Sequence, residues 1–264
     1  MDTRPIGILD SGSGGLSIWK AIISLAPHES TIYIGDHAHI PYSDKTSAFI
    51  RSRIVKLISQ LIKFNCKLCV IACNTATVAG IDWYRKQFPT LPIIGVVPVI
   101  KTAAVITKTN HICILSTKFT AKSDYQKKLI QSFASDKHVV SIGSSTLVFL
   151  IESPGDMKRE IQNELLHVFA PYKTSPIDVI VLGCTHYPFI LDSLRELFDN
   201  RVSIIDSSEA VARQIVRILT NNNTVAVFGK PSYVFLTTGE KARVSAISSK
   251  LLKHKTVVEH ILIS

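Results

Sequence analysis

The sequence has no apolar run of the roughly 18 residues that a membrane-spanning helix requires. Its longest apolar stretch, residues 91–100, is interrupted by Pro92 and Pro98. A secretory signal is also missing, because the short apolar stretch near the start, residues 6–9, stops at Asp10. We therefore expect no membrane association and a protein that remains in the cytoplasm.

Glycine and proline are sparse. The 264 residues include only 12 Gly and 11 Pro, which excludes a fibrous or low-complexity protein. A hydrophobic content of 46% is too high for an intrinsically disordered chain. The length suffices for one large domain or for two smaller domains, each with its own core.

Long runs of one charge sign are absent, although 30 Lys and Arg outnumber 20 Asp and Glu and give a net charge of +10. The densest basic stretches, residues 118–122 and 250–255, have the spacing of amphipathic helices. No basic strand is studded with aromatic residues, as a nucleic-acid groove would be. We interpret the charge as a solvated basic surface that favours a small anionic substrate, and we expect no nucleic-acid partner.

Disulfides are not expected for the five cysteines of a chain without a secretory signal. Cys66 and Cys69 match a C-x-x-C spacing, but no second pair completes a zinc site, and His37 and His39 are the nearest further ligands. Cys69 lies in an apolar run, where cysteine packs as a small hydrophobe. We therefore predict free thiols and no metal.

Short β-branched runs alternate with longer amphipathic runs along the chain. The short runs predict strands at residues 6–9, 31–34, 68–72, 93–97, 111–115, 139–142, 179–182 and 203–205. The longer runs predict helices at residues 15–25, 45–64, 76–88, 121–133, 156–169, 189–198 and 207–220. Because most of the strands are continuously apolar, both faces of their sheet must be covered. The predicted fold class is α/β with open, mostly parallel sheets.

A faint internal repeat predicts two α/β halves. Asp10 and Ser116 each follow an apolar strand, and so do Cys73 and Cys184; the two pairs have nearly the same separation along the chain. Chance is the alternative, because strands followed by polar turns occur in any α/β protein. We predict two similar domains that face each other across a cleft containing the active site. Residues 1–97 plus 207–264 form the first domain, and residues 98–206 form the second.

The Gly-Ser-Gly-Gly turn at residues 12–15 follows the first predicted strand and opens a helix. It fits neither a P-loop nor the G-x-G-x-x-G fingerprint of dinucleotide-binding proteins. Such a turn exposes backbone N–H groups to a small anion such as a carboxylate, or it serves only as a tight connection. The turn alone does not decide between these two interpretations.

Cys73 and Cys184 each end an apolar strand and precede hydroxyl or amide residues that would begin a helix. A helix N-terminus lowers the pKa of a thiol from about 8.5 towards neutrality, and His186 lies close enough in sequence to shuttle a proton. Two thiols across one cleft can remove a proton from one face of a substrate and return one to the other. This chemistry inverts a stereocentre without a cofactor. A single cysteine at a strand end would indicate simple packing. Two cysteines at matching places in the two halves indicate catalysis instead.

Several motifs in this sequence resemble those of bacterial glutamate racemases, in the aspartate/glutamate racemase family. The motifs are ILDSGSGGL at 8–16, GD at 35–36 with PY at 41–42, ACNTA at 72–76, LGCTHYP at 182–188 and TTG at 237–239. The resemblance covers most of the chain. It implies a cofactor-independent racemisation of glutamate by two bases, which supplies D-glutamate for peptidoglycan in the cytoplasm.

The resemblance also implies roles for individual residues. Cys73 acts on the α-proton of D-glutamate and Cys184 on that of L-glutamate, with Asp10 and His186 assisting the thiols. The implied substrate-binding residues are Asp10, Ser11, Tyr42, Ser43, Asn74, Thr75, Thr117, Thr120, Glu152, Thr185 and His186. Such a site must stabilise the carbanion charge that develops when the weakly acidic α-proton leaves.

Three positions depart from the family pattern. Ser43 replaces the usual Gly, His39 stands where Arg is frequent, and Val99 stands where Gly often follows Pro98. None of the three is one of the two thiols, so the expected reaction type does not change. A homodimer and an allosteric activator are both compatible with the resemblance, and the sequence selects neither.

Two other hypotheses remain open from the sequence. The first is a racemase of aspartate or another acidic amino acid. The second is a basic regulatory module that binds nucleic acid or an enzyme such as gyrase. Both cysteines are present, and the hydroxyl-rich turns suit a small dicarboxylate better than a phosphate backbone, for which more Arg would be expected.

Overall fold

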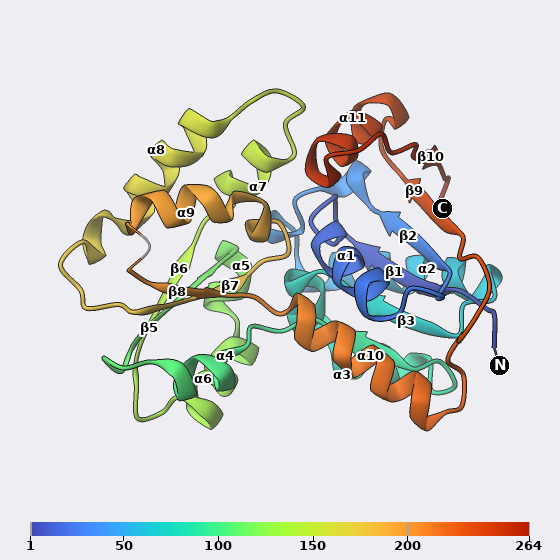
Figure 1. Ribbon diagram of the computed structural model, residues 1–264, viewed down its shortest axis with the longest axis horizontal. Coiled ribbons are helices and arrows are strands. Elements are labelled where there is room, and N and C mark those ends of the chain that lie inside the picture. The colour runs from blue at the N-terminus through green and yellow to red at the C-terminus, as the bar shows by residue number, and fades with distance from the viewer. Residues whose placement is uncertain (1, 200, 264) are drawn as a thin grey trace.

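The computed structural model describes residues 2–199 and 201–263, and these residues form two lobes, one around each of two sheets (Figure 1). The strands are β1 (Ile6–Asp10), β2 (Thr31–Gly35), β3 (Leu68–Ile71), β4 (Ile93–Gly95), β5 (His111–Ser116), β6 (His138–Gly143), β7 (Val179–Gly183), β8 (Ser203–Ile205), β9 (Tyr233–Thr237) and β10 (Glu259–His260). The α-helices are α1 (Leu16–Leu25), α2 (Ser47–Lys63), α3 (Asn74–Gln87), α4 (Ile100–Ile106), α5 (Lys118–Lys122), α6 (Asp124–Phe133), α7 (Thr146–Ile151), α8 (Lys158–Phe169), α9 (Leu191–Leu197), α10 (Ser208–Asn221) and α11 (Lys241–Leu252). Short 3₁₀ turns are η1 (His37–His39), η2 (Tyr42–Asp44), η3 (Ala170–Tyr172) and η4 (Tyr187–Ile190).

The first lobe is built on a six-stranded sheet with the order β10-β9-β2-β1-β3-β4, in which each described strand pair is parallel. Successive side chains of a strand point to opposite faces. Ile8 therefore packs with α1 and α10 on one face, whereas Leu9 packs with α2 and α3 on the other. Covering both faces is what requires the continuous apolar strands of the sequence.

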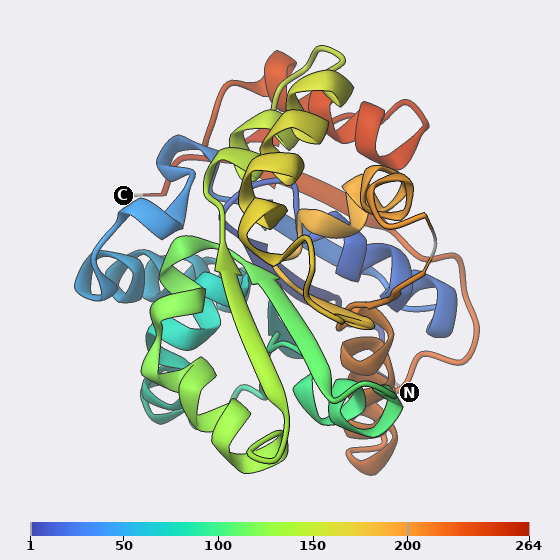
Figure 2. The same ribbon diagram turned by 90° about the vertical axis from the view of Figure 1, so that its left-hand side faces the viewer.

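The second lobe has a four-stranded parallel sheet with the order β6-β5-β7-β8. Figure 2 looks onto this lobe, with its green strands in front of the first lobe. Leu115 faces a core shared with α7, α8 and α9, whereas Ile114 faces a second core shared with α4. Helix α11 joins the lobes, because Leu251 belongs to the core of the second lobe and Leu252 to that of the first.

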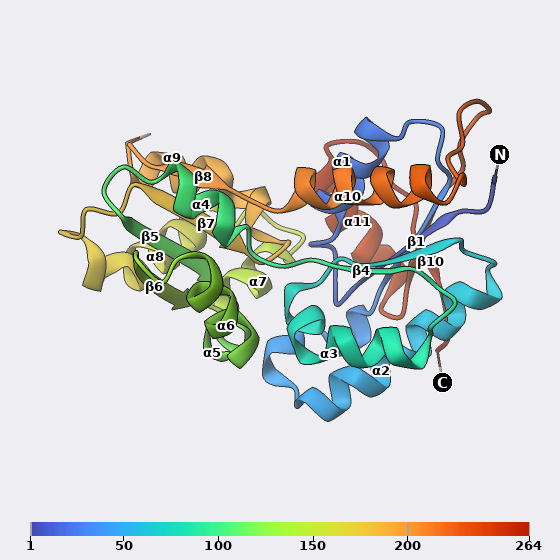
Figure 3. The same ribbon diagram turned by 90° about the horizontal axis from the view of Figure 1, so that it is seen from below.

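The two sheets share a topology, which confirms the prediction of two similar α/β halves. Strands β2-β1-β3-β4 of the first sheet have the same order as β6-β5-β7-β8 of the second. Cys73 follows β3 and Cys184 follows β7, so the two cysteines occupy equivalent places in the repeat. Two chain segments cross between the lobes, one after β4 and one before α10 (Figure 3).

All eight predicted strands are present with small shifts of their ends, and two further strands, β9 and β10, were not predicted. The predicted helix at 121–133 is two helices, because Ser123 ends α5 and its hydroxyl caps the start of α6. The predicted helix at 189–198 begins with a 3₁₀ turn that contains Pro188. Helices α4 and α7 and most of α11 were not predicted; the first two are short and lack a full amphipathic repeat.

The C-terminal part of the chain returns to the first lobe, where α10 packs on α1 and β9 pairs with β2. The domain boundaries at 97 and 207 stay a prediction. Within the described residues, no helix combines the length and apolar character needed to cross a bilayer.

Candidate active site

Cys73 and Cys184 line the same small cavity, which lies between the two lobes. Its walls are Ser11, Pro41, Tyr42, Ser43, Cys73, Asn74, Thr75, Thr117, Val148, Cys184, Thr185 and His186. The space open to the centre of a water molecule is about 10 Å³, which is room for roughly one water. The structure thus brings the two strand-end thiols together in a nearly closed site.

Cys73 is the N-cap of α3. Its sulfur accepts the backbone N–H of Ala76 at 3.5 Å, and its thiol donates to Oγ of Ser11 at 3.7 Å. Burial raises the pKa of Cys73 to about 12, and the nearby carboxylate of Asp10 adds to the rise, whereas the hydrogen bonds that Cys73 makes with Ala76 and Ser11 oppose it. The prediction that the helix N-terminus would lower this pKa towards neutrality is wrong for Cys73, because desolvation of the thiolate outweighs one N–H contact.

Asp10 is fully buried behind the cavity and does not line it. Its carboxylate accepts the N–H of Gly12 at 2.7 Å and the hydroxyl of Thr185 at 3.0 Å, so it ties the first lobe to the second. Burial raises the pKa of Asp10 to about 6, against the opposing effects of the His186 charge and these two hydrogen bonds. Asp10 therefore holds Thr185 and places its charge beside Cys73.

Cys184, His186 and Glu152 form a buried chain of contacts. Sγ of Cys184 lies 3.7 Å from Nδ1 of His186, and Nε2 of the same ring lies 2.7 Å from Oε1 of Glu152. Burial lowers the pKa of His186, but its bonds with Cys184 and Glu152 outweigh that effect and raise the pKa well above its usual value. Burial raises the pKa of Glu152, but the hydrogen bond and charge of His186 reverse this and lower it to about 2. A positive imidazolium is thereby held beside the Cys184 sulfur.

The glycine-rich turn makes room for this chain. A Cβ on Gly12 would lie 2.5 Å from Oε1 of Glu152, and a Cβ on Gly14 would lie 2.3 Å from Nδ1 of His186. The N–H of Gly12 is used by Asp10, and the N–H of Ser13 by Glu152. The carboxylates that these two N–H groups bind belong to the protein itself.

Three threonine hydroxyls join the lobes at one side of the cavity. Oγ1 of Thr75 lies 2.9 Å from Oγ1 of Thr117, which in turn donates to Oγ1 of Thr120 at 3.1 Å. Thr75 and Thr117 line the cavity, whereas Thr120 is fully buried and supports them from outside it. Glu152 likewise lies outside the lining, behind His186.

Asn74 offers an unused acceptor in the cavity wall. Its Nδ2 donates to the backbone oxygen of Val96 at 3.3 Å, while its Oδ1 is buried with no hydrogen-bond partner among the described residues. A buried oxygen without a donor costs free energy unless a ligand supplies one. An ammonium group is such a donor.

The opposite wall is held by residues that the sequence analysis did not single out as site residues. The hydroxyl of Tyr42 donates to Asp36 at 2.6 Å, and Arg53 pairs with the same carboxylate at 2.8 Å. Ser43 meets Ser145 at 3.0 Å between their Oγ atoms. Further residues without a predicted role that line or support the cavity are Ser13, His37, Pro41 and Val148. The quoted motifs were the available signals for three of them: GD at 35–36 for Asp36, PY at 41–42 for Pro41 and ILDSGSGGL at 8–16 for Ser13. The others depend on contacts between distant segments.

The C-x-x-C pair lies elsewhere, in the core of the first lobe. Cys66 and Cys69 are buried free thiols, and burial raises the pKa of Cys66 to about 12. Among residues 2–199 and 201–263, no three His, Cys, Asp or Glu side chains gather as a possible metal site. This pair packs as part of the hydrophobic core.

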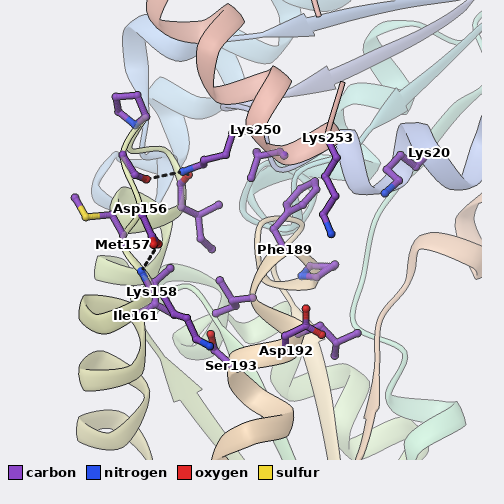
Figure 4. A pocket seen from close by; sticks show the side chains of 17 residues that line it. Lys20, Asp156, Met157, Lys158, Ile161, Phe189, Asp192, Ser193, Lys250 and Lys253 are labelled. Atoms are coloured by element: carbon purple, nitrogen blue, oxygen red, sulfur yellow. Dashed lines mark hydrogen bonds between the residues drawn. The ribbon is translucent and has the colours of Figure 1, made fainter. Parts of the chain in front are cut away.

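A larger cavity of about 630 Å³ lies beside α11 and the segment that follows α7 (Figure 4). Figure 4 labels Lys20, Lys158, Lys250 and Lys253 around it. Lys250 donates to backbone oxygens of the α7–α8 connection, and Lys158 pairs with Glu196 at 2.9 Å. Its described lining contains neither thiol, so size alone does not locate the chemistry.

A family model described as Asp/Glu/Hydantoin racemase matches residues 6–215. The chain belongs to this family. Among curated members, the glutamate racemase of Ectopseudomonas mendocina is 37% identical over 255 residues, which span 96% of this chain and 97% of that protein.

Two solved glutamate racemase structures have the same fold over nearly their whole length. A glutamate racemase isoform from Bacillus anthracis is 29% identical with a TM-score of 0.91, covering 100% of this chain and 99% of that one. Escherichia coli glutamate racemase, solved with L-glutamate and the activator UDP-MurNAc-Ala, is 29% identical with a TM-score of 0.86 and 99% coverage of both chains. The predicted resemblance and fold class are thus confirmed.

Proposed function

We propose that this family member interconverts L- and D-glutamate through the thiols of Cys73 and Cys184, without a cofactor. The observation that carries the proposal is that these two thiols, from equivalent strand ends of the two lobes, line one buried cavity. The full-length similarity to glutamate racemases supports glutamate as the substrate.

The two thiols have complementary surroundings for proton transfer. Cys73 sits next to the carboxylate of Asp10 and is a thiol at neutral pH, because burial raises its pKa to about 12. Cys184 lies 3.7 Å from Nδ1 of the His186 imidazolium, which places a positive charge beside its sulfur. We assign Cys184 as the base towards L-glutamate and Cys73 as the base towards D-glutamate.

The proton balance of the L-to-D reaction follows. The Cys184 thiolate takes the α-proton, which leaves its bonding electron pair on the substrate carbon. The Cys73 thiol then donates its proton to the opposite face of that carbon and becomes a thiolate. Exchange of protons with solvent restores the starting state, and the D-to-L reaction runs the same steps in reverse.

The cavity wall suits the polar groups of glutamate. The unpartnered Oδ1 of Asn74 accepts from the ammonium group, and the hydroxyls of Ser11, Thr75, Thr117 and Thr185 bind the carboxylates, with Tyr42 and Ser43 at the opposite wall. Helix α3 begins at Asn74, and its N-terminus favours a negative charge. Because the cavity holds about one water, the lobes must part for glutamate to enter, and the two crossing segments are the place for that movement.

The biological setting belongs to the same proposal. The enzyme supplies D-glutamate for peptidoglycan and works in the cytoplasm. Its partner is the small-molecule substrate; a homodimer and an allosteric activator of the kind bound to the Escherichia coli enzyme are hypotheses for the same protein.

Circular dichroism of the purified protein with D-glutamate, and separately with D-aspartate, tests the function without added pyridoxal phosphate or metal. We expect the D-glutamate signal to decay and the D-aspartate signal to persist. Decay with D-aspartate alone would assign the protein to aspartate. No decay with either substrate, with or without a muramyl nucleotide, would reject the racemase function and favour a regulatory module.

A further inference from the structure

His37 is a buried imidazole that the two-thiol reaction does not use directly. It follows β2, and only 7% of its side chain is exposed. Its Nε2 lies 2.9 Å from Oγ of Ser13, while its Nδ1 lies 2.9 Å from Oγ1 of Thr237 and 3.1 Å from the backbone oxygen of Gly35. Both ring nitrogens therefore have polar partners from three separate segments of the first lobe.

Two glycines leave the space that this ring occupies. A Cβ on Gly35 would lie 2.3 Å from Cε1 of His37, and a Cβ on Gly239 would lie 2.7 Å from Cβ of His37. Real Cβ atoms do not approach other atoms this closely. The imidazole thus fits in this place because two positions that are far apart in the sequence, 35 and 239, are glycines without a side chain.

The hydrogen bonds assign the protonation of the ring. The hydroxyl of Ser13 donates to Oε2 of Glu152, so its oxygen accepts the hydrogen on Nε2 of His37, and Nδ1 accepts from the hydroxyl of Thr237. Burial lowers the pKa of His37, which keeps the ring neutral at neutral pH. Glu152 and Asp36 oppose this effect with their negative charges, whereas the charge of His186 adds to it.

Ser13 connects the ring to the chain that ends at Cys184. Its N–H donates to Oε1 of Glu152, and its Oγ lies 3.2 Å from Oε2 of the same carboxylate. The same Oε1 binds His186 at 2.7 Å. An anchored Ser13 therefore fixes the carboxylate that keeps His186 charged beside Cys184.

We propose that His37 is a positioning residue of the Cys184 half-reaction: it holds Ser13, which orients Glu152 against His186. This inference rests on the proposed racemase function. Partners behind a reacting group commonly set its orientation and basicity. None of the described hydrogen bonds of His37 reaches Cys73, whereas its bond with Ser13 leads through Glu152 to His186, so we expect its effect at the Cys184 step.

Two variants separate the Ser13 contact from the rest of the ring. His37→Asn keeps an amide near the Nδ1 position but no longer reaches Ser13, whereas His37→Gln places an amide near Nε2 and retains that contact. We expect His37→Asn to lower kcat/KM by about tenfold, which is the effect of losing one hydrogen bond that supports a charged group. His37→Gln should keep most of the wild-type kcat/KM. His39→Asn is the matched control, because that ring contacts Asp36 and not Ser13.

Isotope effects distinguish positioning from a general structural defect. The equilibrium constant between enantiomers is 1, so any variant lowers kcat/KM equally in the two directions. If only the Cys184 step slows, the effect of α-deuteration on kcat/KM rises for the isomer deprotonated by Cys184 and falls for the other isomer. A variant that only loosened the fold would not shift the isotope effects of the two isomers in opposite directions.

A double-mutant cycle with Ser13→Ala completes the test. Because both residues act through one hydroxyl, the double variant should be no slower than either single variant. If His37→Asn does not fold, Ser13→Ala alone should give the same divided isotope effects. The inference would be overturned if the losses in kcat/KM of the two single variants multiplied in the double variant, or if the isotope effects of the two isomers changed in the same direction. The proposed racemase function would stand in either case. A wild-type protein without racemase activity would reject the proposed function itself, and this inference with it.

Discussion

The carboxylate of Glu152 lies 2.7 Å from Nε2 of His186, and the two side chains are only 6% and 3% exposed. Each residue stabilises the charged form of the other, so the pKa of Glu152 is lowered to about 2 and that of His186 is raised. This ion pair is the charged part of what the second lobe contributes to the site. Its partners across the cleft are the glycine turn and Ser13.

Glu152→Gln removes the negative charge of this pair. The stabilisation from Glu152 is present above its unfolded pKa of about 4.3 and is lost as the pH falls towards 2. The stabilisation from His186 is present below its unfolded pKa of about 6.5 and is lost as the pH rises through its raised folded pKa. We expect the variant to lose roughly 3 kcal/mol of unfolding free energy near pH 6, measured by urea denaturation, and little towards pH 2. Glu196→Gln, at an exposed pair with Lys158, is the control. Equal stability of variant and wild type at pH 6 would contradict the ion pair.

Cys73→Ala and Cys184→Ala should each abolish racemisation, because each removes one of the two proposed proton-transfer groups. The far-ultraviolet circular dichroism spectrum should stay that of the wild type. Cys66→Ala, a buried cysteine of the first core, is the control and should retain activity. Racemisation near the wild-type rate in either thiol variant would refute the two-base assignment.

Gly14→Ala tests the space that the turn leaves for His186. The new Cβ would lie 2.3 Å from Nδ1 of the ring, so the imidazole or the turn must move. A displacement of about 1 Å lowers turnover by about a hundredfold, and the crowding costs about 1–3 kcal/mol of stability. Gly155→Ala is matched, because no atom lies within 4 Å of its added Cβ. Assays of kcat with D-glutamate decide the matter, and near-normal turnover in Gly14→Ala would count against the packing argument.

Asp10→Asn should stabilise the fold and reduce activity. The pKa of Asp10 is raised to about 6, so ionising this buried carboxyl costs stability above that pH and costs nothing below the unfolded pKa of about 3.9. We expect a gain of about 2 kcal/mol in unfolding free energy at pH 8 that vanishes below pH 4. The amide can still donate to Oγ of Thr185, whose hydroxyl also accepts. Asp82→Asn, at an exposed carboxylate, is the control and should leave the stability unchanged. An Asp10→Asn variant less stable than wild type at pH 8 would contradict the cost of ionising the buried carboxyl.

Strand and helix order could be predicted from the sequence, because each depends on neighbours within a few residues. The eight short runs, most of them continuously apolar, became strands. The repeat of polar residues at the ends of β1 and β5 and after β3 and β7 predicted two similar sheets. The two-residue edge strand β10 was not predicted because both of its residues are polar and exposed. Strand β9, between β2 and β10, carries the apolar run Tyr-Val-Phe-Leu and was also not predicted, although this signal is in the sequence.

The sequence by itself also indicated the candidate site residues: two cysteines at strand ends, His186, and the hydroxyl and amide residues that follow the cysteines. Only the tertiary structure decided how they act. Burial raises the pKa of Cys73 where the helix terminus alone would lower it, and the glycine turn binds protein carboxylates. His37, Ser13 and Glu152 meet although they are far apart along the chain, because packing of the two lobes sets their distances. Local patterns encode the elements; desolvation and contacts between lobes arise only when the elements pack.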